Sequence, residues 1–155
     1  MNLLYKNICV TGLLVVIPEN ERDFIDDMKM FNFPESRSLK LKEVMGYDKH
    51  RIVKDKTCVS DLAIHGLKHL FNSGGLKKDD FDSLIVVTQS PDHFIPGTSN
   101  VIQGELELKQ DLLCMDITQG CAGYIVGLMQ AFMLLEQPSI NRVVLINGDV
   151  LSRKV

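Results

Sequence analysis

A cysteine at the junction of a predicted strand and a predicted helix is the side chain best suited to covalent chemistry in this 155-residue chain. Cys121 is followed by Ala122 and Gly123, where the sequence predicts a sharp turn into an apolar helix. A thiol on the first helical turn lies among N–H groups that lack helical acceptors, and the helix dipole favours negative charge there. We therefore predict a stabilised thiolate, the form that attacks electrophiles. The alternative is a small buried hydrophobic side chain, as most free cysteines are.

The composition is that of an ordinary globular protein, with 45% hydrophobic and 24% charged residues. A net charge of −3 gives no electrostatic footprint for nucleic acid. No apolar run is long enough to span a membrane, so we expect no membrane insertion. A locally basic stretch predicts either a solvated surface or a landing site for an acidic partner or a phosphate. Its members are Lys40, Lys42, Lys49, Arg51, Lys54 and Lys56.

The cysteines predict neither a metal site nor a disulfide scaffold, and we expect no cofactor. They are Cys9, Cys58, Cys114 and Cys121, and no pair has metal-ligand spacing. A reducing cytoplasm is therefore the expected location. Cys9 and Cys114 lie in strand-like apolar runs, where inert core thiols are expected.

Strands alternate with helices along the sequence, which predicts an α/β fold with a largely parallel sheet. The expected strands are Lys6–Ile17, His50–Val53, Ser83–Thr88, Leu112–Ile117 and Arg142–Ile146. The expected helices are 21–31, 34–45, 59–71, 98–106 and 121–136, with Thr98 as a helix cap. The strands at 83–88 and 112–117 are continuous apolar runs, which is typical of strands buried on both faces.

The helix that follows Cys121 is apolar on every side, from Ala122 to Leu135. A helix on the outer face of one sheet normally has a polar, solvated side, and a helix without one is normally buried all round. We therefore expect a second domain, a second chain, or both to cover its far face. The chain also ends just after a predicted strand, so we interpret it as an N-terminal fragment or as one half of a doubled fold.

The Cys121 segment resembles the nucleophile segment of the 3-oxoacyl-acyl-carrier-protein synthase III family. That segment typically has Asp, a few small or polar residues, Cys-Ala-Gly and an aromatic residue. The matching residues are Asp116-Ile117-Thr118-Gln119-Gly120-Cys121-Ala122-Gly123-Tyr124. Segments 84–88, 93–99 and 148–153 agree with the family in order and spacing. The resemblance covers the whole chain but only the first half of a typical member.

The resemblance implies a thiolase-like fold, in which two similar α/β halves form a five-layer αβαβα architecture. Residues 1–155 would be the N-terminal half-domain, and the C-terminal half would be absent. The implied reaction is acyl transfer from a thioester to Cys121, then decarboxylative Claisen condensation with a malonyl-acyl-carrier-protein. Covalent catalysis of this kind splits one difficult step into two easier ones. The Cys121 amide would donate to the oxyanion, and the family's catalytic His and Asn would lie outside this chain.

The resemblance also implies three substrate-binding residues. Ile95, before Pro96, would reach the partner's acyl pocket in a homodimer and help to set acyl-chain size. Its alternative is an ordinary buried loop residue. Arg153 matches an arginine that holds a coenzyme A adenine opposite a Trp, but this chain has no Trp. A carrier-protein donor is therefore favoured over coenzyme A. Arg51 lies in a segment similar to a Gly-Ile-x-x-Arg motif, in which Tyr47 replaces the Ile.

Two other interpretations remain open at this point. Related thiolase-fold proteins transfer acyl groups without decarboxylation, and the first half alone does not separate these reactions. A catalytically incomplete module for dimerisation or carrier-protein docking is the other. A cysteine hydrolase is disfavoured, because an α/β-hydrolase elbow has Gly-x-nucleophile-x-Gly, whereas Gly120 directly precedes Cys121.

Overall fold

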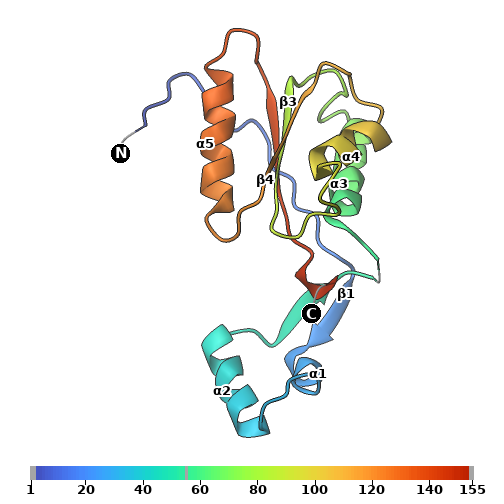
Figure 1. Ribbon diagram of the computed structural model, residues 1–155, viewed down its shortest axis with the longest axis vertical. Helices are drawn as coiled ribbons and strands as arrows, with labels where there is room; N and C mark the ends of the chain where they lie inside the picture. The colour runs from blue at the N-terminus through green and yellow to red at the C-terminus, as the bar shows by residue number, and fades with distance from the viewer. Residues whose placement is uncertain (1–2, 55, 154–155) are drawn as a thin grey trace. The chain divides into compact units, whose positions relative to one another are not determined.

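The computed structural model describes residues 3–54 and 56–153, with the backbone alone for residue 153 (Figure 1). The chain divides into two compact units. The larger unit contains residues 3–16 and 57–151, and the smaller contains residues 17–54 and 56 together with 152–153. Each unit has its own sheet, so the two are described separately.

The larger unit is built on a three-stranded parallel sheet with the order β4-β3-β5. These strands are β3 (Ser83–Val87), β4 (Leu113–Ile117) and β5 (Val143–Asn147). Ser83 pairs with Leu113 on one side and Val143 on the other, so the three strands run in register. The central strand β3 is fully buried, as predicted. The expectation for β4 was wrong, because β4 lies at the edge of the sheet that the described residues form and is only partly buried.

Helices cover both faces of this sheet, with α5 (Gly123–Leu135) on one face and α3 (Val59–Ser73) and α4 (Thr98–Glu105) on the other (Figure 1). Two glycines let α5 approach the sheet closely. A Cβ at Gly123 or at Gly127 would lie 2.6 Å from a methyl group of Val87, which is closer than packed atoms tolerate. The α/β architecture and the parallel sheet predicted from the sequence are therefore confirmed.

The outward face of α5 is exposed within the part of the chain that the structure describes. Tyr124, Ile125 and Met133 are 46–64% exposed, while only Gly123, Gly127 and Ala131 are buried. The helix therefore packs one side on β3 and β5 and leaves apolar side chains on the other. That something covers this face stays a prediction.

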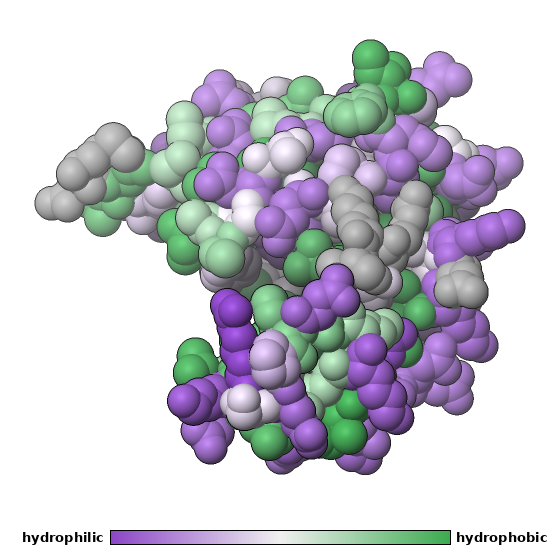
Figure 2. All heavy atoms as spheres, turned by 60° about the horizontal axis from the view of Figure 1, so that its bottom comes forward, coloured by the Kyte–Doolittle hydropathy of each residue, from purple (hydrophilic) through white to green (hydrophobic). Residues whose placement is uncertain are grey.

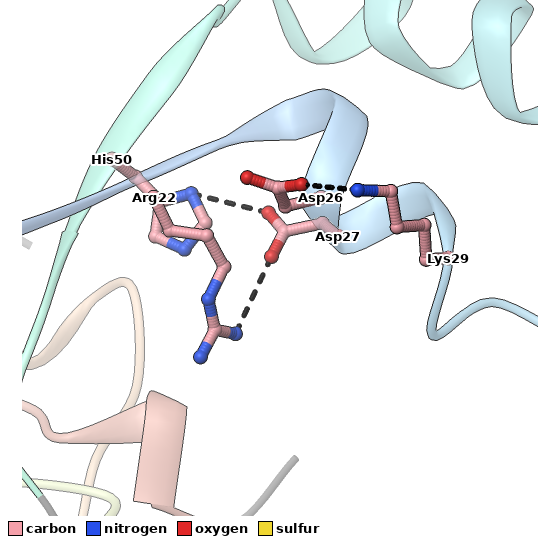
Figure 3. Close-up of polar contacts among 5 residues, drawn as sticks. All are labelled: Arg22, Asp26, Asp27, Lys29 and His50. Carbon is pink, nitrogen blue, oxygen red and sulfur yellow. Dashed lines mark hydrogen bonds and ion pairs between the residues drawn. The ribbon is translucent and has the colours of Figure 1, made fainter.

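The smaller unit pairs two antiparallel strands, β1 (Asn20–Asp23) and β2 (Lys49–Ile52), with helices α1 (Phe24–Met28) and α2 (Glu35–Met45). Phe24 is fully buried and packs edge-on against Phe31 and Tyr47. Beside this core, Asp27 lies 3.4 Å from Arg22 and 3.3 Å from His50 (Figure 3). A buried carboxylate costs free energy unless it is paired, and the Arg22 guanidinium is the charge partner of this one.

Three of the six residues in the basic stretch pair with nearby carboxylates. Lys42 pairs with Asp48 at 2.6 Å, and Lys49 and Arg51 pair with Glu21 at 2.9 and 3.4 Å. Figure 2 shows hydrophilic and hydrophobic side chains interleaved over the visible surface. These pairs favour the solvated surface over a landing site for a phosphate.

Two of the helices end at glycines. Gly46 and Gly74 adopt left-handed conformations at the ends of α2 and α3, with φ of 72° and 74°. Such φ values strain residues that have a Cβ, which is why glycine ends helices so often. Among the described residues, no helix has both the length and the apolar character needed to cross a membrane.

Two element predictions near the N-terminus were wrong. Lys6–Ile17 forms no strand, although its residues are apolar enough for one. A strand needs a hydrogen-bonded neighbour, and within the described residues no strand pairs with this segment. Tyr5 instead packs its ring against Phe132 of α5. The helix expected over 21–31 is also shorter, because residues 20–23 pair with β2 before α1 begins.

Candidate functional site

Cys121 lies in a turn at the carboxyl end of the parallel sheet. Residues 118–120 lead out of β4, and the Gly123 N–H donates to the Gly120 carbonyl over 2.7 Å to close the turn. The prediction that the thiol lies on the first turn of the helix was wrong by two residues. The helix α5 begins at Gly123, and Ala122 is its N-cap. Cys121 is exposed and reduced, so the buried-hydrophobe alternative is also wrong.

The backbone amide of Cys121 has no acceptor among the described residues. An N–H group at a helix start that makes no internal bond is available to an anion. Cys121 therefore presents both a thiol and a backbone N–H without an acceptor at the surface of the larger unit.

An aspartate holds together the loops that follow β3 and β5. Oδ1 of Asp149 accepts hydrogen bonds from the Thr88 hydroxyl (2.9 Å), the Gln89 backbone N–H (2.8 Å) and the Ser90 hydroxyl (3.1 Å). The Ser90 hydroxyl in turn accepts a hydrogen bond from the Val150 N–H over 2.8 Å. These bonds lock two strand ends together beside the strand that leads to Cys121.

The same aspartate orients the side chain of Gln89 toward the Cys121 turn. Nε2 of Gln89 donates to Oδ2 of Asp149 over 3.1 Å. Its other terminal atom, Oε1, faces Gly120, and a Cβ at Gly120 would lie 3.0 Å from it. The glutamine amide thus lies between Asp149 and the residue before Cys121.

A second aspartate anchors the loop that carries Ile95. Asp116, at the end of β4, accepts hydrogen bonds from the Ser99 N–H (3.0 Å) and the Ser99 hydroxyl (2.8 Å). A Cβ at Gly97 would collide with this carboxylate, so the loop approaches β4 only because residue 97 is glycine. The cap of α4 therefore comes from Asp116, and the expectation that Thr98 caps it was wrong. The Thr98 hydroxyl is buried without a partner among the described atoms.

The structure places the other predicted site residues as follows. Ile95 is 89% exposed at a loop tip beside Phe94, which is fully exposed, so the buried-loop alternative for Ile95 is wrong. Arg51 lies in the smaller unit, where it donates to the Glu19 carbonyl over 2.7 Å. The backbone of Arg153 ends the 3₁₀ turn Leu151–Arg153, and its side chain lies outside the described part of the chain.

Histidines do not pair with Cys121 in the described structure. His50 lies beside Asp27 in the smaller unit (Figure 3), and His65 and His69 lie on α3, where both are exposed. His93 is exposed in the loop after β3. No hydrogen bond or ion pair joins any of the four to the thiol. The residues described bring together no group of three or more side chains that could hold a metal ion.

The remaining cysteines differ from Cys121 in their surroundings. Cys114 is half-buried in β4, where burial, and next the nearby Asp116 carboxylate, raises the pKa of its thiol. Cys58 forms a capping box with Asp61 at the start of α3. Cys9 is exposed, so the expectation of a core thiol was wrong for it.

Gln89 and Asp149 lie around the site, although neither was predicted from the sequence as a site residue. A signal was present, since Thr88-Gln89-Ser90 and Gly148-Asp149 each directly follow an apolar strand. Residues at the carboxyl ends of parallel strands gather at one edge of the sheet, where ligands bind in such folds.

A family model matches residues 115–155, which include Cys121, and its description is 3-oxoacyl-[acyl-carrier-protein (ACP)] synthase III. A putative 3-oxoacyl-[acyl-carrier-protein] synthase 3 from Campylobacter jejuni is 36% identical over 145 residues, covering 93% of this chain and 41% of the relative. A β-ketoacyl-[acyl-carrier-protein] synthase III from Clostridium perfringens is 27% identical, covering 96% of this chain and 44% of the relative.

A solved structure agrees with these relatives. The 3-oxoacyl-(acyl-carrier protein) synthase from Burkholderia xenovorans LB400 matches with a TM-score of 0.74 and 28% identity, over 84% of this chain and 37% of that one. The resemblance inferred from the Cys121 segment is confirmed, and so is the thiolase-like fold. The chain spans 41% and 44% of the lengths of the two relatives described above.

Proposed function

We propose that the full-length protein that carries this 3-oxoacyl-acyl-carrier-protein synthase III-like chain is a condensing acyltransferase, and that Cys121 is its acyl-accepting nucleophile. The observation that carries the proposal is an exposed thiol in a turn at the carboxyl end of the parallel sheet, inside the segment that matches the family. Residues 1–155 would supply its N-terminal thiolase-like half-domain.

In the first step the Cys121 thiolate attacks the carbonyl carbon of an acyl thioester, and a carbon–sulfur bond forms. The resulting oxyanion accepts a hydrogen bond from the Cys121 N–H, which has no other acceptor among the described residues. Collapse of this intermediate expels the carrier as a thiolate, which takes up a proton to give the thiol, and leaves the acyl group on Cys121. The exposure of Cys121 supports access by a bulky donor.

In the second step a malonyl-acyl-carrier-protein loses CO₂, and the resulting carbanion attacks the acyl-enzyme and releases the thiolate. The described histidines do not contact Cys121, so this step is assigned to residues outside these 155. Ile95, Arg51 and Arg153 are the proposed substrate-binding residues. The exposure of Ile95 supports such a role for that residue. The hydrogen bond from Arg51 to the Glu19 carbonyl would compete with substrate binding by Arg51.

The nucleophile is tested by incubating the full-length protein with acetyl-coenzyme A or an acetyl-acyl-carrier-protein and measuring the intact mass. Wild type should gain one acyl group, and Cys121→Ala should gain none. Cys9→Ala is the matched control, because Cys9 is also an exposed free thiol, and it should keep the adduct. An unmodified wild type, or an adduct that survives Cys121→Ala, contradicts the proposal.

A non-decarboxylating acyltransferase is the alternative reaction for the same thiol. The exposed Cys121 thiol could accept an acyl group in either reaction, so this chain by itself does not separate the two. Product analysis with and without a malonyl donor separates the two reactions. Condensation predicts a β-keto product and CO₂ only when the malonyl donor is present.

A homodimer is part of the same proposal. Phe94 and Ile95 are 100% and 89% exposed at one loop tip, and adjacent exposed apolar side chains are typical of an association surface. Sedimentation of the full-length protein should show a dimer, and the double substitution Phe94→Ser/Ile95→Ser should shift it toward monomer. A wild-type monomer at every concentration would exclude the dimer.

A further inference from the structure

We propose that Gln89 is a positioning residue for Cys121, and that Asp149 fixes the direction in which the Gln89 amide acts. The inference rests on the proposed function of Cys121 and names how this chain holds the turn that carries it. Gln89, Asp149 and Gly120 come from the ends of three neighbouring parallel strands, in a single compact unit.

The Gln89 amide has a fixed orientation. A glutamine side chain has one donor end and one acceptor end, and a carboxylate only accepts. Because Asp149 accepts the hydrogen bond from Nε2, Oε1 must face the other way, toward Gly120. The backbone N–H of Gln89 donates to the same carboxylate, so the residue is held at two points.

The Gln89 amide also makes a close contact with the Cys121 turn. A Cβ at residue 120 would lie 3.0 Å from Oε1 and 3.6 Å from Cδ of Gln89, so the glycine and the amide occupy adjoining space. Gln89 therefore limits how far the peptide before Cys121 can move toward β3. The exposed thiol has no hydrogen-bonded partner of its own among the described residues, so the backbone on either side of it sets its direction.

The position of the thiol affects its reactivity. A nucleophile held in the productive geometry reacts faster, and misplacement by about 1 Å can cost about a hundredfold in rate. Removing the Gln89 amide should therefore lower the reaction rate of the Cys121 thiol without removing any group that touches the substrate. Gln89 acts through Gly120, which distinguishes it from a catalytic residue.

The first experiment measures alkylation of Cys121 by iodoacetamide from pH 6 to 9, by intact mass, in the full-length protein with Cys9→Ala as background. Gln89→Ala should lower the rate by about tenfold or more. Gln103→Ala is the matched control, because the Gln103 amide also makes one recorded hydrogen bond, to the Lys109 carbonyl at the amino end of β4. An unchanged rate in Gln89→Ala overturns the proposal.

The second experiment reverses the polarity of the hydrogen bond that joins the two side chains. Gln89→Glu replaces the donor with an oxygen and sets two carboxylates against each other, which favours protonation of one of them. The ratio of its alkylation rate to that of wild type should therefore rise as the pH falls. The double variant Gln89→Glu/Asp149→Asn restores one donor and one acceptor and should recover the rate at neutral pH. A double variant no faster than Gln89→Glu overturns the assigned orientation.

The third experiment tests the contact itself. Gly120→Ala should slow alkylation when Gln89 is present, because the new methyl group displaces the amide. It should have a smaller effect in a Gln89→Ala background, where that atom is gone. If Gly120→Ala slows alkylation equally with and without Gln89, the proposed contact between Gln89 and Gly120 is wrong. Because alkylation needs no acyl donor, these outcomes stand even when wild type accepts no acyl group, a result that would contradict only the proposed function.

Discussion

The two ends of the parallel sheet are each tied together by an aspartate, but the two carboxylates have different partners. At the amino end, Asp82 accepts hydrogen bonds from the N–H groups of Asn141 (2.8 Å) and Arg142 (3.2 Å) and from the Lys109 ammonium (3.0 Å). At the carboxyl end, the recorded donors to Asp149 are neutral hydroxyl, amide and backbone groups.

The different partners indicate different roles: Asp82 stabilises the fold, and Asp149 helps to position a reactive group. The backbone N–H of Asn141 first, then the Lys109 ammonium, lowers the pKa of the Asp82 carboxyl. No hydrogen bond or ion pair recorded for Asp82 leads toward a nucleophile. Asp149 instead holds the glutamine that packs against the Cys121 turn. Stability should therefore depend more on the amino end, and reactivity on the carboxyl end.

The largest expected effect on stability is that of Asp82→Ala. It removes the acceptor of two backbone N–H groups and one lysine, and each of these solvent-accessible hydrogen bonds contributes about 1 kcal/mol net. We expect a loss of about 3 kcal/mol in the free energy of unfolding, measured by urea denaturation. Alkylation of Cys121 in the folded protein should be unchanged, and a parallel loss of reactivity would break the comparison.

A somewhat smaller loss is expected for Gly97→Ala at the carboxyl end. The added methyl group would meet the Asp116 carboxylate and displace it from Ser99. Overpacking and loss of a helix cap each cost on the order of 1–2 kcal/mol, so we expect about 2 kcal/mol in urea denaturation. Unchanged stability would show that the loop tolerates a side chain at this position.

The pH dependence of stability tests whether Asp82 stabilises the amino end of the sheet. Because the folded-state pKa of Asp82 lies below its unfolded value, its contribution is fully present above the unfolded pKa. That contribution is lost as the pH falls below about 5 toward the folded-state pKa. Wild type should therefore lose more stability between pH 7 and pH 4 than Asp82→Asn does. Identical losses would show that Asp82 is not the group responsible.

The smallest expected effect is a gain, from Gly104→Ala in the last turn of α4. Nothing lies within 4 Å of a Cβ added there, in contrast to Gly97 just before the same helix. Replacing a glycine inside a helix by alanine stabilises it by about 0.5–1 kcal/mol. The melting temperature should rise slightly, and a decrease would mean that the open space is filled in the full-length protein.

Local sequence pattern was sufficient for most elements of this fold. Each of three features fixes one element through short-range interactions: the continuous apolar run of β3, the side of α3 that buries Ala63, Gly66 and Leu67, and the glycines that end α2 and α3. The Cys121 segment was recognised for the same reason, because its informative residues are contiguous. A prediction of this kind needs no knowledge of which segments meet in space.

Long-range pairing decided the rest. Residues 6–17 have the composition of a strand but no hydrogen-bonded neighbour among the described residues, and β4 is half exposed because it lies at the edge of the described sheet. Gln89 and Asp149 are 60 residues apart, and the residues around one of them do not predict a hydrogen bond to the other. Only the parallel register of three strands brings them beside Gly120, because a hydrogen-bonded contact depends on distance in space and not on separation along the chain.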